Sequence, residues 1–190
     1  MKKNLVISLA AAFLLPMTVS AASIETTGAV MFDGDVYLAQ QEVEKDYVRT
    51  AEFIKGDESG DSWTRVIAIR HHPRLMSPMT AAEKFGKKLQ EENPGLTYEV
   101  TPCNGGKEAL IQFTLPTGNS GSVFNAYRFM KQEGYAGLVS YQFSSRVPAF
   151  SVAKVGLSSP DRQKWVNELI SANFDYRIGN PAQRTMASNR

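Results

Sequence analysis

The sequence predicts an α+β fold in which an antiparallel β-sheet of about six strands carries two amphipathic helices. Stretches of alternating apolar and polar residues recur along most of the chain, and turn-length connections separate the last four of them. Two other stretches place apolar residues at the three- and four-residue spacing of a helix. The 190 residues are 43% hydrophobic and 21% charged. This composition is typical of one globular domain and excludes a fibrous or wholly disordered chain.

The first 22 residues have the three parts of a signal peptide. Two lysines precede an apolar run over residues 5–15, and small residues follow near Ala21 and Ala22. We therefore expect residues 1–22 to be removed by cleavage after one of these two alanines. The apolar run is too short to cross a bilayer, and no cysteine stands near the cut to carry a lipid anchor. The expected product is a soluble periplasmic or secreted protein that does not span the membrane.

A single domain is expected to follow a short leader. Residues 23–45 begin with small residues and glycines and are interpreted as that leader, ahead of a domain over 46–178. Alternation over 46–54 and again over 63–70 predicts two strands. The polar, turn-rich loop between them predicts that they pair antiparallel.

The pattern then becomes helical. Thr80 stands three residues before Glu83, which is the spacing of a capping box at the start of a helix. Ala82, Phe85 and Leu89 recur at spacings of three and four and form one apolar face. An Asn-Pro-Gly sequence then ends a helix of about 13 residues.

Four further strands are expected over residues 96–100, 109–115, 123–131 and 138–146. Asn104-Gly105-Gly106 supplies residues that tolerate a positive φ and can reverse the chain between the first two. The third strand is expected to be at least partly buried on both faces. In the last, Val139, Tyr141 and Phe143 alternate with Ser140, Gln142 and Ser144. This alternation predicts a strand whose polar face lies in water.

A second helix is predicted after Ser159-Pro160-Asp161, a capping residue followed by a proline and an acid in the first turn. Trp165 and Leu169 begin its apolar stripe. Residues 179–190 have little to bury and are expected to form a flexible tail. The predicted order is β-β-α-β-β-β-β-α, with both helices packed on the sheet.

The charge balance argues against binding to nucleic acid. The chain has 21 Lys and Arg against 19 Asp and Glu, and two of the positive charges are Lys2 and Lys3 in the predicted signal peptide. The rest of the chain is therefore neutral, whereas phosphate backbones are bound mainly by an excess of basic residues.

One junction supports a resemblance to known proteins. The strand end Glu-Phe-Ile-Lys-Gly-Asp at residues 52–57, a polar loop and then Trp63-Thr64 resemble small secreted bacterial proteins of unknown function. The element order over residues 46–176 is similar to that of the PsbP-like fold. This resemblance implies an antiparallel sheet flanked by helices and a non-enzymatic role as an accessory or partner-binding protein.

His71, His72 and Cys103 are the candidate site residues, as the only histidines and the only cysteine of the chain. Together they would form a metal site or a thiol active site only if a bend and a second loop brought them to one place. A solvated strand end and a small residue near a turn are the alternatives. We expect no catalytic residue, no metal and no cofactor.

Aromatic and arginine side chains crowd two consecutive predicted strands. If one sheet face stays uncovered, six of them would form a surface for a protein partner; otherwise most belong to the core. The six are Tyr127, Phe129, Tyr135, Tyr141, Arg128 and Arg146. The sequence therefore favours an exported, non-enzymatic binding or accessory protein of the cell envelope. The alternatives are a small hydrolase or thiol enzyme and a carrier of a small apolar ligand held between sheet and helix.

Overall fold

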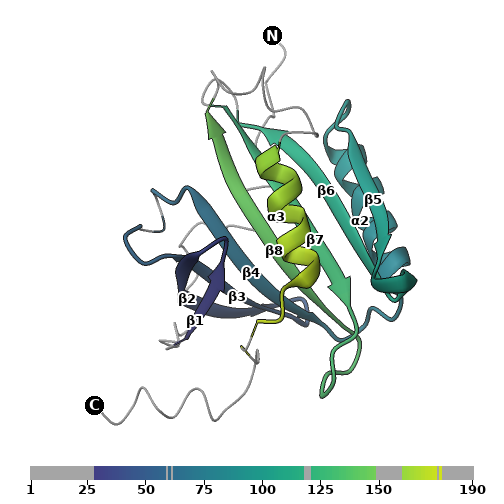
Figure 1. Ribbon diagram of the computed structural model, residues 1–190. Coiled ribbons are helices and arrows are strands. Elements are labelled where there is room, and N and C mark those ends of the chain that lie inside the picture. Colours follow the sequence, from purple (N-terminus) through teal and green to yellow (C-terminus); the bar gives the residue numbers. More distant parts are fainter. Residues whose placement is uncertain are drawn as a thin grey trace.

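The described residues form one antiparallel sheet of eight strands and two α-helices (Figure 1). The computed structural model describes residues 28–58, 60, 62–117, 121–148, 160–174 and 176. The strands are β1 (Ala29–Phe32), β2 (Asp35–Lys45), β3 (Val48–Lys55), β4 (Arg65–His72), β5 (Tyr98–Cys103), β6 (Glu108–Pro116), β7 (Gly121–Met130) and β8 (Leu138–Pro148). The helices are α2 (Pro78–Glu92), α3 (Pro160–Ser171) and a short 3₁₀ turn, η1 (Asn104–Gly106). The predicted α+β class with an antiparallel sheet and two helices is confirmed.

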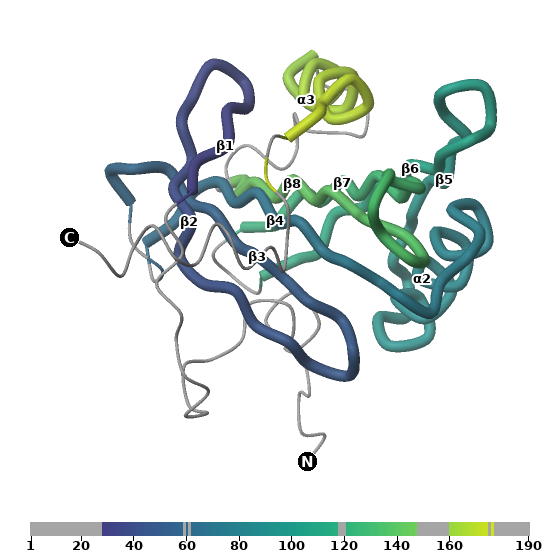
Figure 2. Tube along the Cα trace, turned by 90° about the horizontal axis from the view of Figure 1, so that it is seen from below, coloured from purple at the N-terminus to yellow at the C-terminus, as the bar shows by residue number. Residues whose placement is uncertain are grey.

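The strand order is β1-β2-β3-β4-β8-β7-β6-β5. The sheet therefore consists of two meanders, one before α2 and one after it, which meet where β4 pairs with β8. The two helices pack on opposite sides of the sheet. α2 contacts β5, β6 and β7, and α3 contacts β7 and β8. Figure 2 shows the two helices on opposite sides of the sheet.

The prediction of a leader over residues 23–45 is wrong for residues 29–45, and the predicted number of about six strands is therefore too low. Residues 29–45 form β1 and β2, which add two strands to the sheet. The signal was an Asp-Gly pair: Asp33 and Gly34 have φ of 53° and 76°. Two consecutive residues with positive φ make the tight turn that suits the twist of a hairpin. The side chains of Val30 and Phe32 are buried and that of Met31 between them is exposed, which is the alternation of a half-buried strand.

The β1–β2 turn also holds α3 in place. Asp33 accepts a hydrogen bond from Trp165 Nε1 at 2.8 Å and forms ion pairs with Arg65 and Lys164. The predicted helix after residue 159 is confirmed as beginning at Pro160. Val166 and Leu169 from its apolar stripe are buried against the sheet.

α2 begins earlier than its predicted capping box. Its N-cap is Ser77, whose hydroxyl accepts a hydrogen bond from the backbone N–H of Thr80 at 3.3 Å. Pro78 follows at the first helical position, where the missing N–H costs nothing. Thr80 therefore lies inside the first turn, and the sequence pattern placed the cap three residues too late.

The last strand, β8, departs most from its prediction. Tyr141 and Phe143 face α3 and are buried, as expected. Ser140, Gln142 and Ser144 on the other side are buried as well, rather than in water. β8 is a central strand between β4 and β7, and neighbouring polar residues satisfy its polar side. β7 is buried along its whole length, as predicted.

Three predictions lie outside the described residues. These are the signal peptide at 1–22, the capping residue Ser159 and the tail at 179–190.

Candidate binding groove

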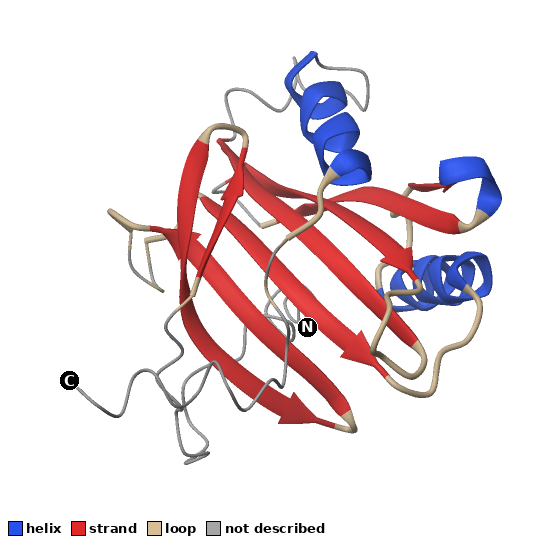
Figure 3. Ribbon diagram, turned by 60° about the horizontal axis from the view of Figure 1, so that its bottom comes forward, coloured by secondary structure: helices blue, strands red, loops and turns tan. Residues whose placement is uncertain are grey.

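A groove of about 810 Å³ lies between α2 and the β2–β3 hairpin. Its floor is the central part of the sheet, with Arg70 of β4, Ser140 of β8 and Phe129 of β7. Phe85 of α2 forms part of one wall, and Val48 of β3 forms part of the other. Figure 3 shows the sheet curving between these elements.

Among the residues that the structure describes, the placement of α2 leaves this part of the sheet uncovered. α2 packs on β5, β6 and β7, which are at one side of the sheet, and does not extend over β3. Its close approach to the edge strand depends on Gly86, because a Cβ there would overlap the ring of Tyr98 on β5. At the other wall, the β2–β3 turn is made by Asp46 and Tyr47, with φ of 52° and 68°. Figure 2 shows the β2–β3 end of the sheet bending toward the side that α2 occupies.

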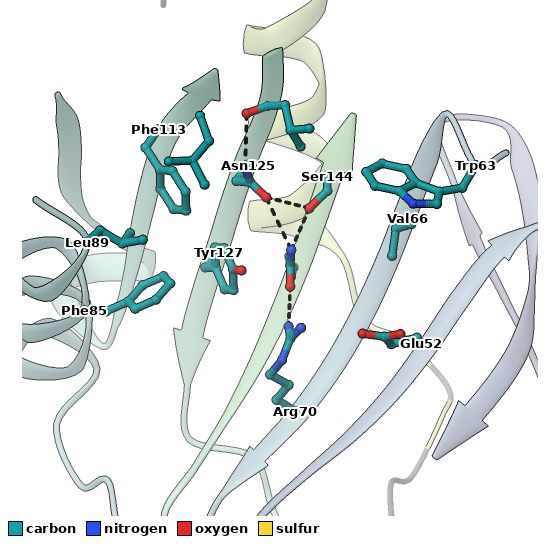
Figure 4. A pocket seen from close by; sticks show the side chains of 13 residues that line it. Glu52, Trp63, Val66, Arg70, Phe85, Leu89, Phe113, Asn125, Tyr127 and Ser144 are labelled. Atoms are coloured by element: carbon teal, nitrogen blue, oxygen red, sulfur yellow. Dashed lines mark hydrogen bonds between the residues drawn. The ribbon is translucent and has the colours of Figure 1, made fainter. Parts of the chain in front are cut away.

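A chain of polar side chains begins at Arg70 on the floor and runs into a smaller cavity that adjoins the groove (Figure 4). Arg70 donates a hydrogen bond to Gln142 Oε1, and Gln142 Nε2 donates to Ser144 Oγ at 2.6 Å. Ser144 Oγ in turn donates to Asn125 Oδ1 at 2.7 Å. All four residues are buried. Because a buried polar group without a partner is costly, this network explains how a polar strand face can lie inside the protein.

Glu52 of β3 lies beside this network and is also buried. Burial raises the pKa of its carboxyl group, whereas the charge of Arg70 and a hydrogen bond from Gln41 act in the opposite direction. Gln41 Nε2 donates to Glu52 Oε2 at 3.2 Å. Glu52 and Arg70, with Phe85 and Tyr127, also line a smaller cavity of about 30 Å³ that adjoins the groove on the same face of the sheet. That space is about the size of one water molecule.

Of His71, His72 and Cys103, His72 is the one that lines the groove, together with Tyr127 and Phe129 from the predicted aromatic set. Its Nε2 lies 2.8 Å from Ser140 Oγ. Burial, with the nearby charges of Arg70 and His71, lowers the pKa of His72 to about 3. The imidazole is therefore uncharged at neutral pH and acts in the groove as a polar, neutral group.

Basic side chains surround the opening of the groove. Lys84 and Lys88 are exposed on α2, Lys45 ends β2, and Arg74 follows β4. The guanidinium of Arg74 lies 3.7 Å from the centre of the Tyr47 ring, a cation–π contact that joins the two walls at one end. The groove thus combines a partly polar floor, apolar walls and a cationic rim.

The structure does not bring the two histidines and the cysteine together. His71 and His72 point to opposite faces of β4, and His71 Nε2 contacts the carbonyl oxygen of Ala136 at 2.7 Å. Cys103 ends β5 at the edge of the sheet, with three strands between it and β4. At about 4.8 Å per strand, this is a separation of about 19 Å. Burial raises the pKa of the Cys103 thiol, and Glu108 raises it further, so the reactive thiolate is disfavoured.

The six aromatic and arginine residues do not form one surface. Tyr127 and Phe129 face α2 and are buried, whereas Arg128 and Tyr141 are buried on the opposite face. Successive strand residues point to opposite sides, which explains the division. The other two lie apart: the Tyr135 ring packs on His71, and Arg146 lies over Trp63. For the four buried residues the core interpretation is the correct one.

Sequence reasoning missed the polar residues on the floor of the groove and in the cavity beside it. Glu52, Arg70 and Gln142 each occupy a strand position that points to the same side as apolar neighbours, such as Val66 on β4. The sequence does contain one signal for this polar site. It is a charged residue that points to the buried side of a strand rich in β-branched residues. It shows that a polar site exists, but not which strands lie side by side.

Neither a cluster of metal ligands nor a membrane-spanning helix is found in the part of the chain that the structure describes. There, no group of three or more His, Cys, Asp or Glu is placed to hold a metal ion. Within the same residues, no helix has the length and apolar character needed to cross a membrane.

Comparison with known proteins gives a family but no activity. No curated protein and no solved structure matches the chain. A model of an uncharacterised protein family matches residues 24–174, which include both helices and all eight strands of the sheet. The chain therefore belongs to this family.

Proposed function

We propose that this protein is an exported binding protein that holds a small, largely apolar ligand in the groove between α2 and the sheet. The observation that carries the proposal is the groove itself. Its volume of about 810 Å³ lies in the usual range for sites that bind small molecules. Aromatic and aliphatic side chains of α2, β3 and β7 line it, and a few polar groups converge on its floor, as such sites require.

The chemistry of the floor suits binding better than catalysis. Arg70 and Gln142 hold each other within a hydrogen-bonded network, and His72 is neutral and bonded to Ser140. These contacts fix the side chains in position. A rigid, satisfied floor favours a carrier, since its groups need not reorganise when a ligand enters.

Export is part of the proposal on a separate ground, whereas a protein partner is the competing function. Export depends on the signal-peptide pattern of residues 1–22. A protein partner would need a surface other than the predicted aromatic one, because Tyr127, Phe129 and Tyr141 are buried. The ligand-carrier alternative is therefore the one that the geometry favours.

The test uses a neutral apolar fluorophore, N-phenyl-1-naphthylamine, with the purified mature protein. We expect saturable binding, because the dye is small, apolar and uncharged. Thr80→Trp, which places an indole at the α2 wall, should weaken binding by about tenfold or more. Glu83→Trp is the matched control, since Glu83 is exposed on α2 and does not line the groove. Absence of saturable binding, or equal losses in both variants, would refute the proposal.

A second measurement identifies natural ligands. Organic extracts of the protein, purified from its own cell envelope without detergent, are analysed by mass spectrometry. We expect a small apolar compound to be enriched with the unmodified protein and depleted with Thr80→Trp. Equal recovery from the two would count against the groove as the binding site.

A further inference from the structure

We infer that the ligand of this groove is a single-chain amphiphile with an anionic head group. The inference rests on the proposed function and adds the chemical class of the ligand. It follows from how charge and apolar surface are distributed between the rim of the groove and its interior.

The groove concentrates positive charge in a chain that, beyond Lys2 and Lys3, is neutral as a whole. Five basic side chains line it, against two acidic ones. The basic ones are Lys45, Arg70, Arg74, Lys84 and Lys88, and the acidic ones are Asp46 and Glu52. Beyond Lys2 and Lys3, the whole chain has equal numbers of basic and acidic residues. A cleft lined mainly by one sign of charge attracts ligands of the other sign.

Apart from Arg70 and Glu52, which are buried at the floor, the charges and the apolar surface occupy different depths. Lys84 and Lys88 are exposed and lie one helical turn apart on α2, so both are at the rim. Phe129 is buried at the floor, and Phe85 is partly buried on the inner side of α2. An amphiphile satisfies this arrangement, because its chain covers the aromatic interior while its head remains at the cationic rim. A fully apolar ligand would leave the rim unused.

The rim cations are available to a head group. Within the described residues, Lys45 and Lys84 form no ion pair, and Lys88 contacts only the exposed Glu92, at 3.8 Å. Such an exposed pair is weak and is readily exchanged for another anion. Arg74 is held over Tyr47 by a ring contact that leaves its charge in place. Two lysines on one wall and Lys45 on the other thus face the opening.

The experiment compares three ligands that share one chain: dodecanoate, dodecanol and dodecyltrimethylammonium. Each competes with N-phenyl-1-naphthylamine on the mature protein, the two ionic ligands below their critical micelle concentrations and dodecanol below its solubility limit. We expect dodecanoate to bind about tenfold more tightly than dodecanol, and the cationic ligand most weakly. Added salt should weaken dodecanoate selectively, because the rim charges are exposed to solvent.

A charge-matched pair of double variants identifies the head-group site. Lys84→Gln with Lys88→Gln should weaken dodecanoate about tenfold and leave dodecanol unchanged. The control is Lys87→Gln with Lys107→Gln, which removes the same charge from exposed positions that do not line the groove. This control should bind dodecanoate as the unmodified protein does.

The possible failures are distinguishable. If neither the dye nor any of the three ligands binds, both the carrier function and this inference are overturned. If the dye and dodecanol bind but dodecanoate has no advantage, the carrier function stands and the anionic class is wrong. Equal losses of dodecanoate in the two double variants would also overturn it, since a general charge effect would then be enough.

Discussion

Arg128 of β7 and Glu108 of β6 form a two-point ion pair inside the protein, with N–O distances of 2.6 and 3.0 Å. A third guanidinium nitrogen donates to the carbonyl oxygen of Leu169, at 3.1 Å, and to that of Ala172. The same side chain therefore links two strands to the C-terminal end of α3, where carbonyl groups lack helical partners.

Replacing Arg128 with Met should destabilise the protein strongly. Loss of one partner from a buried pair leaves the other charge uncompensated, at a cost of about 3–5 kcal/mol. The measurement is urea unfolding at neutral pH. Arg49→Met is the control, because Arg49 pairs with Glu44 at 2.7 Å at an exposed site, where about 0–1 kcal/mol is at stake. Similar losses in the two variants would contradict this account.

Gln142→Leu should disrupt the polar network that adjoins the floor of the groove. The change removes one acceptor of Arg70 and a donor to Ser144, and the loss of a hydrogen bond by a buried group costs about 1–3 kcal/mol. Gln112→Leu on β6 is the matched control, since Gln112 is only half-buried and bonds to the exposed Glu99. Its effect should stay within about 1 kcal/mol. A stable Gln142→Leu protein would show that the network is dispensable.

His72 should make the protein less stable in mild acid. Its pKa is lowered from 6.5 to about 3 in the folded protein, so the unfolded chain takes up the proton first as the pH falls below 6.5. The contribution of His72 to the free energy of unfolding is fully present above that pH. It decreases as the pH falls toward 3, by up to about 1.4 kcal/mol per pH unit. His72→Gln should flatten the decrease. The two unfolding free energies are compared from pH 7 to pH 4, and parallel curves would refute the prediction.

Gly86→Ala should push α2 away from the edge of the sheet. The new Cβ would overlap the ring of Tyr98, and an overpacked contact typically costs about 1–3 kcal/mol, against a gain of about 1 kcal/mol in helix propensity. Tyr98→Ala in the same chain removes the clash, so the double variant should lose less than the sum of the two single changes. Strict additivity, measured by thermal unfolding, would mean that the ring is not the obstacle.

The elements that the sequence predicted well are those whose signal is local. Alternation identified β3 to β8, and the Ser-Pro-Asp sequence placed the start of α3 at Pro160. β1 and β2 were missed although Asp33-Gly34 is a hairpin signal, because the small residues before it suggested a leader. β8 was assigned a solvated face because Ser140, Gln142 and Ser144 are polar. The sequence of this strand does not show that it lies in the middle of the sheet, between β4 and β7.

The groove could not be predicted because its residues come from separate elements. Glu52, Arg70 and Gln142 are far apart in the sequence and meet only through the order of β3, β4 and β8. His72 was selected for its chemistry, although it stands in the floor as a neutral hydrogen-bonding group rather than as a metal ligand. Tyr127 and Phe129 were selected as a partner surface and instead lie beneath α2. Local pattern identified polar and aromatic candidates, and only the strand order decided which of them share a face.

The pairing of β4 with β8 has a consequence for how the chain acquires its structure. It joins residues 66 to 80 positions apart, from His72 with Leu138 to Arg65 with Ser145. Each meander can form from its own hairpins, because their strands are close in the sequence. The β4–β8 junction instead requires closure of a long loop, and the entropic cost of that closure comes before any stabilising contact forms. Proteins dominated by such distant pairings fold in about milliseconds to seconds. Until β8 pairs with β4, water solvates its polar side chains. The exposed edge of β8 is therefore less prone to self-association than the edge of an apolar strand would be.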